Sequence, residues 1–326
     1  MDKELYEKLH RITAEEKAIL KGSEHIEASL YTSKLKAGET FVVDSSYLLE
    51  KGLKIDIRPH TRFVHFPKHT HNYVEMVYMY SGSTTHIIND SERLVLKEGD
   101  LLFLNQNATQ EILPAGEDDL AVNFIILPEF FETSISMLEQ NNIIGNFLVS
   151  SLSPNNKYSD YLYFNARDIL PVQNLLENMI WTIFKKSTHS NTLNQTTMGL
   201  IFMNLSEFAT NINKNQDNDY EQNLIFTLLR YIETNYKDAS LEEISAKLKQ
   251  PTYQMSRLLK KYTDKNFKEL LKERKLEQAS YLLLETKMSV ENVMNAIGYD
   301  NSSYFYRIFE SHYGVSPKNY RKLFGK

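Results

Sequence analysis

The 326-residue chain contains no cysteine and a single tryptophan. None of its apolar runs approaches the ~20 residues that a membrane-spanning helix needs. The lack of cysteine excludes disulfides, thiolate zinc sites and a cysteine nucleophile, and it is compatible with a reducing cytoplasm. Residues 1–20 alternate charged and aliphatic side chains, which is not the pattern of a signal peptide. We therefore expect a soluble, cytoplasmic protein with no membrane partner.

The net charge is −5, which by itself argues against a nucleic-acid partner, but the charge is unevenly distributed. Residues 220–326 hold 18 Lys and Arg against 13 Asp and Glu, whereas the other residues hold 19 against 29. A basic C-terminal segment that follows an acidic N-terminal part is expected when only one domain contacts nucleic-acid phosphates. Lys-rich helices that are merely solvent-exposed are also common. Charge alone leaves both interpretations open.

The length exceeds what one hydrophobic core usually spans, so two domains are expected. The polar run 211–219 contains Ile212 as its one apolar residue and is predicted to connect them. We place the first domain at residues 1–212, the linker at 213–220 and the second domain at 221–326.

A short pattern occurs twice in the second domain, fifty positions apart. Thr252–Leu259 aligns with Ser302–Phe309, and in both copies apolar residues fall at i, i+3 and i+4. This spacing predicts an amphipathic helix, here called a reading helix, with one buried stripe and a polar face that carries Tyr and one Arg. A shorter amphipathic helix precedes each copy, at Leu241–Leu248 and Val290–Ile297. Two helices joined by a tight turn are typical of a helix-turn-helix unit.

The segment between the two units, Phe267–Glu285, has no Gly or Pro and is predicted to be one helix. At about 1.5 Å per residue it would span roughly 28 Å, close to the ~34 Å between successive major grooves on one face of a duplex. Pro251 and Asp300 are predicted to start the two reading helices. Ser289 is predicted to cap the helix before the second turn, and Gly298 to close it. The sequence thus predicts a bipartite reader of double-stranded DNA.

The second copy and the residues after it resemble the signature of AraC/XylS-type transcription regulators. The resemblance is carried by Ala296–Phe305, Arg307, Phe309, Gly314, Ser316, Pro317, Tyr320 and Arg321. It covers about residues 219–326 and implies two helix-turn-helix subdomains joined by a long helix. The first copy departs from the pattern at Lys249 and Asp264, where Gly is usual.

The polar faces of both reading helices are expected to contact bases or phosphates. The predicted residues are Tyr253, Gln254, Ser256 and Arg257 in the first unit and Ser302, Ser303, Tyr306 and Arg307 in the second. An Arg here can bond guanine O6 and N7 together, and the alternatives are a phosphate contact or an ion pair within the domain. Backbone contacts are expected from Lys260, Lys261, Lys265 and Lys268, and mostly core positions for Tyr304, Phe305 and Phe309.

The first domain changes from an opening helix, Lys3–Leu20, to short β-branched and aromatic runs. These runs are Thr61–Phe66, Val74–Tyr80, Thr84–Ile88, Arg93–Leu96, Leu101–Leu104 and Leu120–Leu127. Such closely spaced runs predict a small barrel or jelly roll. Two helices are predicted after it, Asp168–Lys186 and Leu193–Asn211, which either pack back on the barrel or form a dimer seam.

Within the β-rich region, His69, His71, Glu75 and Gly82 resemble the first cupin motif, with Phe63 where a Gly is usual; Gly99–Asp100 starts the second motif. Cupin enzymes bind a metal through two His and one carboxylate of the first motif and a third His of the second. The position that should supply this third His is Gln110, and Gln is a poor ligand for first-row transition metals. We therefore predict no catalytic residue, no metal, no cofactor and no enzymatic activity.

A retained pocket that binds a small effector through hydrogen bonds is the favoured prediction. Its expected lining is His69, His71, Tyr73, Glu75 and Gln110, with Arg62 and Asn105 as further candidates. These groups suit a polyhydroxylated ligand, and the family resemblance implies that sugars are common effectors. Two rivals stay open: the histidines are ordinary strand residues, or the chain is a metal-dependent cupin enzyme with a helical appendage.

These patterns predict an α+β multidomain protein with an N-terminal cupin-like β-barrel, flanking helices, and a C-terminal all-α domain of two helix-turn-helix units joined by a long helix. The predicted function is that of a sequence-specific transcription regulator controlled by a small-molecule effector such as a sugar. The resemblance implies an activator that contacts RNA polymerase, and a homodimer is expected. A regulator whose barrel only dimerises is the alternative within this class.

Overall fold

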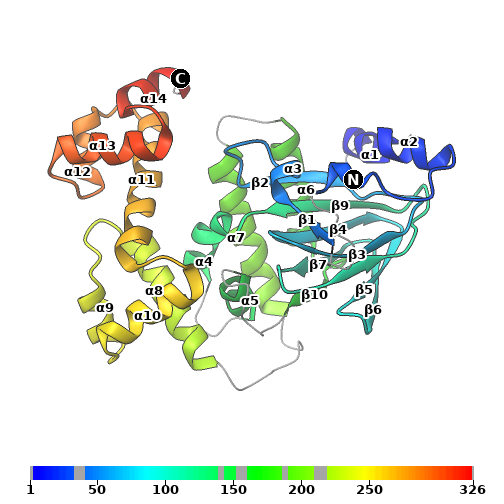
Figure 1. Ribbon diagram of the computed structural model, residues 1–326, viewed down its shortest axis with the longest axis horizontal. Coiled ribbons are helices and arrows are strands. Elements are labelled where there is room, and N and C mark those ends of the chain that lie inside the picture. Colours follow the sequence, from blue (N-terminus) through cyan, green and yellow to red (C-terminus); the bar gives the residue numbers. More distant parts are fainter. Residues whose placement is uncertain are drawn as a thin grey trace. The chain divides into compact units, whose positions relative to one another are not determined.

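The computed structural model describes residues 3–32, 41–138, 143–151, 160–185, 190–208 and 219–324. The chain divides into two compact units, Met1–Asp219 and Tyr220–Lys326 (Figure 1). Each unit has its own hydrophobic core. Within the described residues, no helix is both long enough and apolar enough to cross a membrane.

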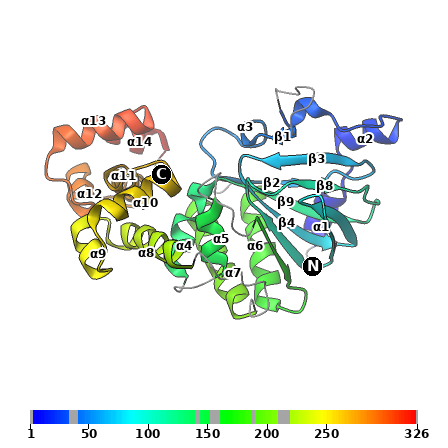
Figure 2. The ribbon, with the colours of Figure 1, turned by 60° about the horizontal axis from the view of Figure 1, so that its bottom comes forward.

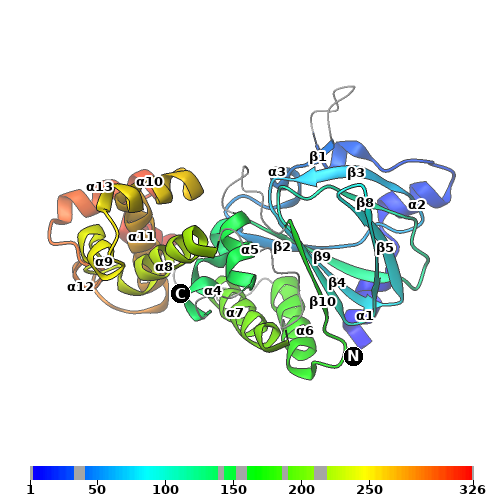
Figure 3. The same ribbon diagram turned by 90° about the horizontal axis from the view of Figure 1, so that it is seen from below.

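The N-terminal unit is built on two five-stranded sheets that face each other (Figure 3). The first sheet has the order β1 (Phe41–Val43), β3 (Phe66–His71), β8 (Gln110–Ile112), β5 (Ser83–Ile88), β6 (Glu92–Lys97). The second has the order β10 (Tyr161–Asn165), β7 (Asp100–Leu104), β4 (Val74–Ser81), β9 (Leu120–Ile126), β2 (Ile55–Pro59). Paired strands are antiparallel except β1 and β3, which run parallel. This is the predicted cupin-like barrel.

Helices cover the outer face of the second sheet, which is why β4 and β7 are buried on both faces. These helices are α4 (Glu132–Met137), α5 (Ile143–Ser151), α6 (Leu170–Lys185) and α7 (Ser190–Phe208), and α6 and α7 lie side by side (Figure 2). Phe103 of β7 packs against Phe147 of α5 and Phe202 of α7, and the Tyr78 hydroxyl donates to Gln173 of α6. The two helices predicted after the barrel therefore pack back on it.

Two local predictions for this unit were wrong. The opening segment forms two helices, α1 (Lys3–His10) and α2 (Ala14–Leu20), because Thr13 starts a new helix through a capping box with Glu16. The run Thr61–Phe66 is not a strand, since Phe63 has a φ of 68°, a left-handed conformation that extended backbone cannot contain. The remaining short elements are η1 (Ala28–Leu30), α3 (Ser45–Leu48) and η2 (Pro128–Phe131).

The C-terminal unit is entirely helical, as predicted. Its helices are α8 (Asp219–Asn235), α9 (Leu241–Lys247), α10 (Thr252–Thr263), α11 (Phe267–Glu285), α12 (Val290–Ala296), α13 (Ser302–Tyr313) and α14 (Pro317–Phe324). The two repeat copies have equal lengths, 7 residues before the turn and 12 in the reading helix. The connecting helix α11 has the predicted bounds. Residues 213–218 of the predicted linker lie outside the described residues, and 219–220 begin α8.

The two helix-turn-helix turns close in the same way although one lacks glycine. Lys249 (φ 53°) and Gly298 (φ 76°) are both left-handed, and the next residue in each turn donates its N–H to the carbonyl five residues earlier, Gln250 to Ser245 and Tyr299 to Met294. This is the Schellman closure of a helix. For a non-glycine residue this conformation costs roughly 1–2 kcal/mol.

The helix ends around the second turn correct one prediction. The N-cap of α13 is Asn301, whose side chain accepts from the Tyr304 N–H at 2.9 Å, so the predicted cap at Asp300 was wrong by one residue. Ser289 caps α12 as predicted. After the reading helices, Asp264 (φ 56°) and Gly314 (φ 76°) again share the left-handed conformation, so the first unit keeps the backbone of the second.

Candidate ligand pocket and nucleic-acid interface

A cavity lies between the two sheets of the N-terminal unit. It is lined by Tyr31, Val43, Leu48, Arg58, Pro59, His60, Thr61, Phe66, His69, His71, Tyr73, Glu75, Ile112, Asn123 and Ile125. The cavity volume is about 40 Å³, which leaves room for roughly three water molecules. Leu48, Arg58 and Thr61 are partly exposed and mark its mouth, whereas the histidines and Glu75 are buried.

Both sheets contribute polar side chains to the deep end of this cavity. His69 and His71 come from β3, and the ring of His69 is fixed by the Pro67 carbonyl, 2.7 Å from its Nδ1. Glu75 of β4 accepts from the Asn123 amide of β9 at 3.1 Å, and its other oxygen lies 3.6 Å from His71 Nε2. The register of β4 on β9, with Glu75 opposite Ile125, brings this carboxyl group beside Asn123.

Burial keeps these titratable groups uncharged. It lowers the pKa of His60 and of His69 to about 4, and that of His71 well below its usual value. It raises the pKa of Glu75 to about 8, although hydrogen bonds from Asn123 and Gln110 act in the opposite direction. At neutral pH, His71 and Glu75 are thus neutral neighbours and not an ion pair. The deep end is polar without net charge.

Several buried polar atoms around the cavity lack a hydrogen-bond partner within the described residues. They are His60 Nδ1, His71 Nδ1, Glu75 Oε2, Gln110 Oε1 and Asn123 Oδ1. An unsatisfied buried polar group costs about 1–3 kcal/mol. Such a cluster is expected where a ligand that both donates and accepts hydrogen bonds supplies the missing partners.

The structure places the predicted pocket residues as follows. His69, His71, Tyr73 and Glu75 line the cavity, whereas Gln110 is not among its lining residues and is paired across the strands with His69. The Gln110 amide donates to His86 Nδ1 at 2.8 Å, which leaves the Nε2–H of that ring for Thr84 at 2.9 Å.

The two further candidates do not line the cavity. Asn105 donates to Ser150 at 3.1 Å, and Arg62 pairs with Glu16 at 2.7 Å. Both were wrong as pocket residues. Arg58, His60 and Asn123 also line the cavity but were not predicted. Their only signal in the sequence was their position in or next to strands that pair with distant strands.

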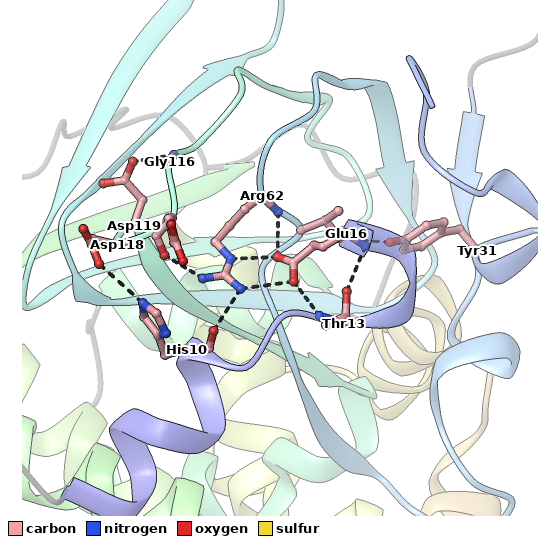
Figure 4. Close-up of polar contacts among 10 residues, drawn as sticks. His10, Thr13, Glu16, Tyr31, Arg62, Gly116, Asp118 and Asp119 are labelled. Atoms are coloured by element: carbon pink, nitrogen blue, oxygen red, sulfur yellow. Dashed lines mark hydrogen bonds and ion pairs between the residues drawn. The ribbon is translucent and has the colours of Figure 1, made fainter. Parts of the chain in front are cut away.

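Arg62 instead anchors the N-terminal helices to the barrel (Figure 4). Its guanidinium holds both carboxylate oxygens of Glu16, and it also donates to the backbone carbonyls of Glu117 and His10. Burial alone would raise the pKa of Glu16, but hydrogen bonds from Arg62 and Thr13 and the Arg62 charge lower it. Both side chains are at most 2% exposed, so this ion pair is a structural link.

The donor set does not fit a cupin metal centre. Within the described ranges, no three His, Asp or Glu side chains lie close enough together to hold one ion. The side chain in the position of the third histidine is the Gln110 amide, whose nitrogen is engaged with His86.

The reading helix α10 of the C-terminal unit presents polar and basic groups to solvent. Tyr253 is 75% exposed, Arg257 and Lys260 are exposed, and Gln254 and Ser256 are half-buried. The opposite face buries Met255, Leu258, Leu259 and Tyr262. Among the predicted backbone contacts, Lys261 pairs with Glu221 at 2.6 Å and Lys265 with Glu273 at 2.8 Å.

The second reading helix, α13, repeats this arrangement with more aromatic character. Ser302, Ser303, Tyr306 and Arg307 are exposed, and Phe305 and Phe309 are buried in the core with Leu276 and Val293. Tyr304 was predicted to be mostly core, but it is 40% exposed because it lies on the polar side of the helix. The Arg307 guanidinium stacks over its ring at 5.4 Å. All eight predicted reading-helix residues therefore lie on the outward or flanking faces.

Two domains in one chain, a barrel with a ligand cavity and a pair of helix-turn-helix units, define the class of a ligand-responsive DNA-binding protein. Comparisons with known proteins agree with this class. Residues 57–135 match the AraC-like ligand binding domain, and residues 244–323 match a family described as helix-turn-helix domain.

The relatives cover most of the chain or its DNA-binding part. The chain is 25% identical over 257 residues to the HTH-type transcriptional activator RhaS of Mannheimia succiniciproducens, covering 78% of this chain and 89% of that protein. It is 41% identical over 59 residues to the DNA-binding dual transcriptional regulator Rns of Escherichia coli, 18% of this chain and 22% of that protein. A crystal structure of ToxT from Vibrio cholerae is similar at 15% identity and a TM-score of 0.39, covering 85% of this chain and all of that one.

The chain belongs to the AraC/XylS family of transcription regulators, with an N-terminal ligand-binding domain and a C-terminal helix-turn-helix DNA-binding domain. The resemblance drawn from the signature residues is confirmed.

Proposed function

We propose that this protein is a cytoplasmic transcription activator that binds a promoter site as a homodimer, contacts RNA polymerase, and responds to an uncharged polyhydroxylated molecule such as a sugar. We also propose that it has no enzymatic activity. The observation that carries the choice of ligand is the cluster of buried polar atoms without partners around the barrel cavity. The activator role is supported by the similarity to the transcriptional activator RhaS, with which most of the chain aligns.

An uncharged ligand fits the electrostatics of the cavity. A carboxylate or phosphate at the deep end would meet neutral histidines and a protonated Glu75. A cation would meet Arg58 at the mouth, where its guanidinium lies over the Tyr31 ring at 5.3 Å. Hydroxyl groups can both donate to the free oxygens and accept from the imidazoles. The cavity has room for roughly three waters, so a sugar ring enters only when side chains at the mouth move.

Ligand control requires that the effector prefer one arrangement of the protein over another. The arrangement concerned is either the docking of the barrel unit on the reader or the pairing of two chains through α6 and α7. Leu193, Leu200 and Met203 are exposed on α7, which supports the second route.

An effector should raise the thermal midpoint of the barrel unit. A ligand present at 100 times its Kd stabilises by about 2.7 kcal/mol, which is several degrees for a unit of this size. In a screen of neutral sugars and sugar alcohols, wild-type protein should shift with at least one compound. Asn123→Leu should lose that shift, because it removes a cavity amide, whereas Asn165→Leu, an exposed asparagine at a strand end, should keep it. Equal shifts in both variants would place the ligand outside this cavity.

Arg307→Ala should weaken binding to the preferred duplex by about 1–3 kcal/mol, roughly 5- to 150-fold, with little loss on random duplex. The reason is that a base contact discriminates between sequences and a phosphate contact does not. Lys260→Ala is the matched comparison: it should weaken both duplexes alike and reduce the salt slope by about one. Fluorescence anisotropy over a salt series measures both. Equal losses for Arg307→Ala on the two duplexes would assign that side chain to the phosphates.

The rival enzyme class is tested separately. We expect elemental mass spectrometry of protein purified without chelator to detect no stoichiometric metal. Retained metal that is lost in His69→Ala would favour a metal-dependent cupin activity over the proposed function.

A further inference from the structure

The connecting helix α11 carries a buried lysine that the DNA-reading surface does not use. Lys275 is 9% exposed, and its Nζ donates to the Gly298 carbonyl at 3.1 Å. The ammonium also lies over the ring of Tyr299 at 4.9 Å. Gly298 and Tyr299 form the turn of the second helix-turn-helix unit. A buried charge is costly unless it is paired and hydrogen-bonded. The contacts with Gly298 and Tyr299 meet this requirement for the Lys275 ammonium.

A segment from the other half of the unit reaches the same turn. The corner between α8 and α9 places the Lys237 carbonyl so close to Gly298 that a Cβ on that glycine would lie 2.6 Å from the oxygen. Burial lowers the pKa of Lys275, and the nearby carboxylates of Asp238, in this corner, and Asp300, in the turn, favour its charged form. Three segments therefore meet at one ammonium group: the α8–α9 corner, α11 and the second turn.

The α8–α9 corner is itself tied to the first helix-turn-helix unit. The Tyr231 hydroxyl of α8 donates to Glu243 of α9 at 2.6 Å, and Glu221 of α8 pairs with Lys261 of α10. On the other side, Tyr236 at the end of α8 packs against the core of the second unit. A displacement of either unit would have to break contacts at this corner.

Arg274, the residue next to Lys275 on α11, adds a second link to α8. It pairs with Glu233 of α8 at 2.7 Å, and its guanidinium lies over the Tyr236 ring at 4.8 Å. The two helix-turn-helix units are thus joined by more than the covalent path through α11. Helix α8 lies on one side of α11 and contacts both units.

We propose that Lys275 is a positioning residue that locks the α8–α9 corner to the second turn and so fixes the separation and rotation of the two reading helices. The lock sets the spacing between the two half-sites that one chain reads on DNA. It rests on the proposed reading of bases by both α10 and α13. Inserting one base pair between the two half-sites moves one of them by about 3.4 Å and rotates it by roughly 36° about the duplex axis. A protein whose two reading helices are held rigidly then loses contacts with one half-site. A protein with a hinge between the two units can follow the displaced half-site.

The first test measures spacing selectivity with the full-length protein. Duplexes selected from a random pool with wild-type protein are remade with one base pair inserted or deleted between the two protected halves. Wild-type protein should lose about tenfold or more in affinity for either change. Lys275→Met, which keeps the aliphatic stem, should lose about threefold or less, and Lys275→Arg should restore the wild-type profile. A Lys275→Met profile as steep as that of wild type would overturn the proposal.

The second test needs no DNA and uses the absence of cysteine. Spin labels on Ala246→Cys and Ser311→Cys, exposed positions on α9 and α13, report the distance between the two units. A narrow distance distribution is expected in free wild-type protein, and a broadened one in Lys275→Met at a temperature where circular dichroism shows it folded.

A broad distribution in wild-type protein, or a narrow one in folded Lys275→Met, would overturn the lock. If Lys275→Met does not fold, Asp238→Asn, which removes one of the charges beside the ammonium, takes its place with the same expected broadening. Failure of wild-type protein to select any duplex would contradict the proposed function, and the label distances would still decide the lock.

Discussion

Replacing Glu16 by glutamine should destabilise the N-terminal unit by about 3–5 kcal/mol, the cost of breaking a buried ion pair. The substitution leaves the Arg62 guanidinium buried at 2% exposure without its partner. An arginine cannot escape this cost by losing its proton, because a guanidinium stays protonated in proteins. The anchor between the N-terminal helices and the barrel should therefore fail before the rest of the unit.

Trp181 provides the measurement because it is the single tryptophan of the chain and lies in the same unit. It also reports on the N-terminal helices, since Lys8 of α1 lies over its ring at 4.7 Å. Denaturant unfolding followed by Trp181 fluorescence should show a lower free energy of unfolding for Glu16→Gln. Glu7→Gln, at an exposed position on α1, should leave the free energy of unfolding unchanged. The double variant Glu16→Leu with Arg62→Met should recover most of the lost free energy of unfolding, because neither partner is then left charged. Unchanged stability in Glu16→Gln would contradict the anchor.

Glu75→Gln should stabilise the same unit at pH 8 by on the order of 3–4 kcal/mol and have little effect near pH 4. The folded protein raises the pKa of Glu75 from 4.5 to about 8, so folding favours the protonated carboxyl. Stability from this group is fully present below pH 4.5 and is lost as the pH rises towards 8, because the unfolded chain releases the proton first. Glutamine has nearly the same side-chain shape but cannot ionise. The Glu75→Gln variant should therefore not lose this stability as the pH rises.

The difference between wild type and Glu75→Gln is the informative quantity, because the buried histidines contribute equally to both. Unfolding curves at several pH values between 4 and 8.5 should diverge steadily with rising pH. Parallel pH dependences would mean that Glu75 is ionised in the folded barrel, and the neutral character of the cavity would be contradicted. Glu7→Gln again serves as the exposed control.

The C-terminal unit was predictable almost residue by residue because its signals are local. The repeat at Thr252–Leu259 and Ser302–Phe309, the cap at Ser289 and the turn at Gly298 each act within one or two helical turns. The errors were equally local. Asn301 took the capping position from Asp300, and Tyr304 fell on the exposed side of its helix.

The barrel was less predictable because its pairing is between distant segments. His69 and His71 could be expected to share a pocket with Glu75, since one motif contains all three. Arg58 and Asn123 could not, because they become neighbours only through the pairing of β2 with β9. The loop containing Arg62 looked like a strand from its composition, and only the long-range partner Glu16 explains its burial.

The central claim, that one chain inserts two reading helices into neighbouring major grooves, is tested most directly by footprinting. Purified full-length protein is given duplexes selected from a random pool, and protection of guanine N7 from methylation is mapped at low salt. The account predicts two protected patches on one face of the duplex, about one helical turn apart, with the patch read by α13 lost in Arg307→Ala. A single patch, or no protected bases, would contradict it.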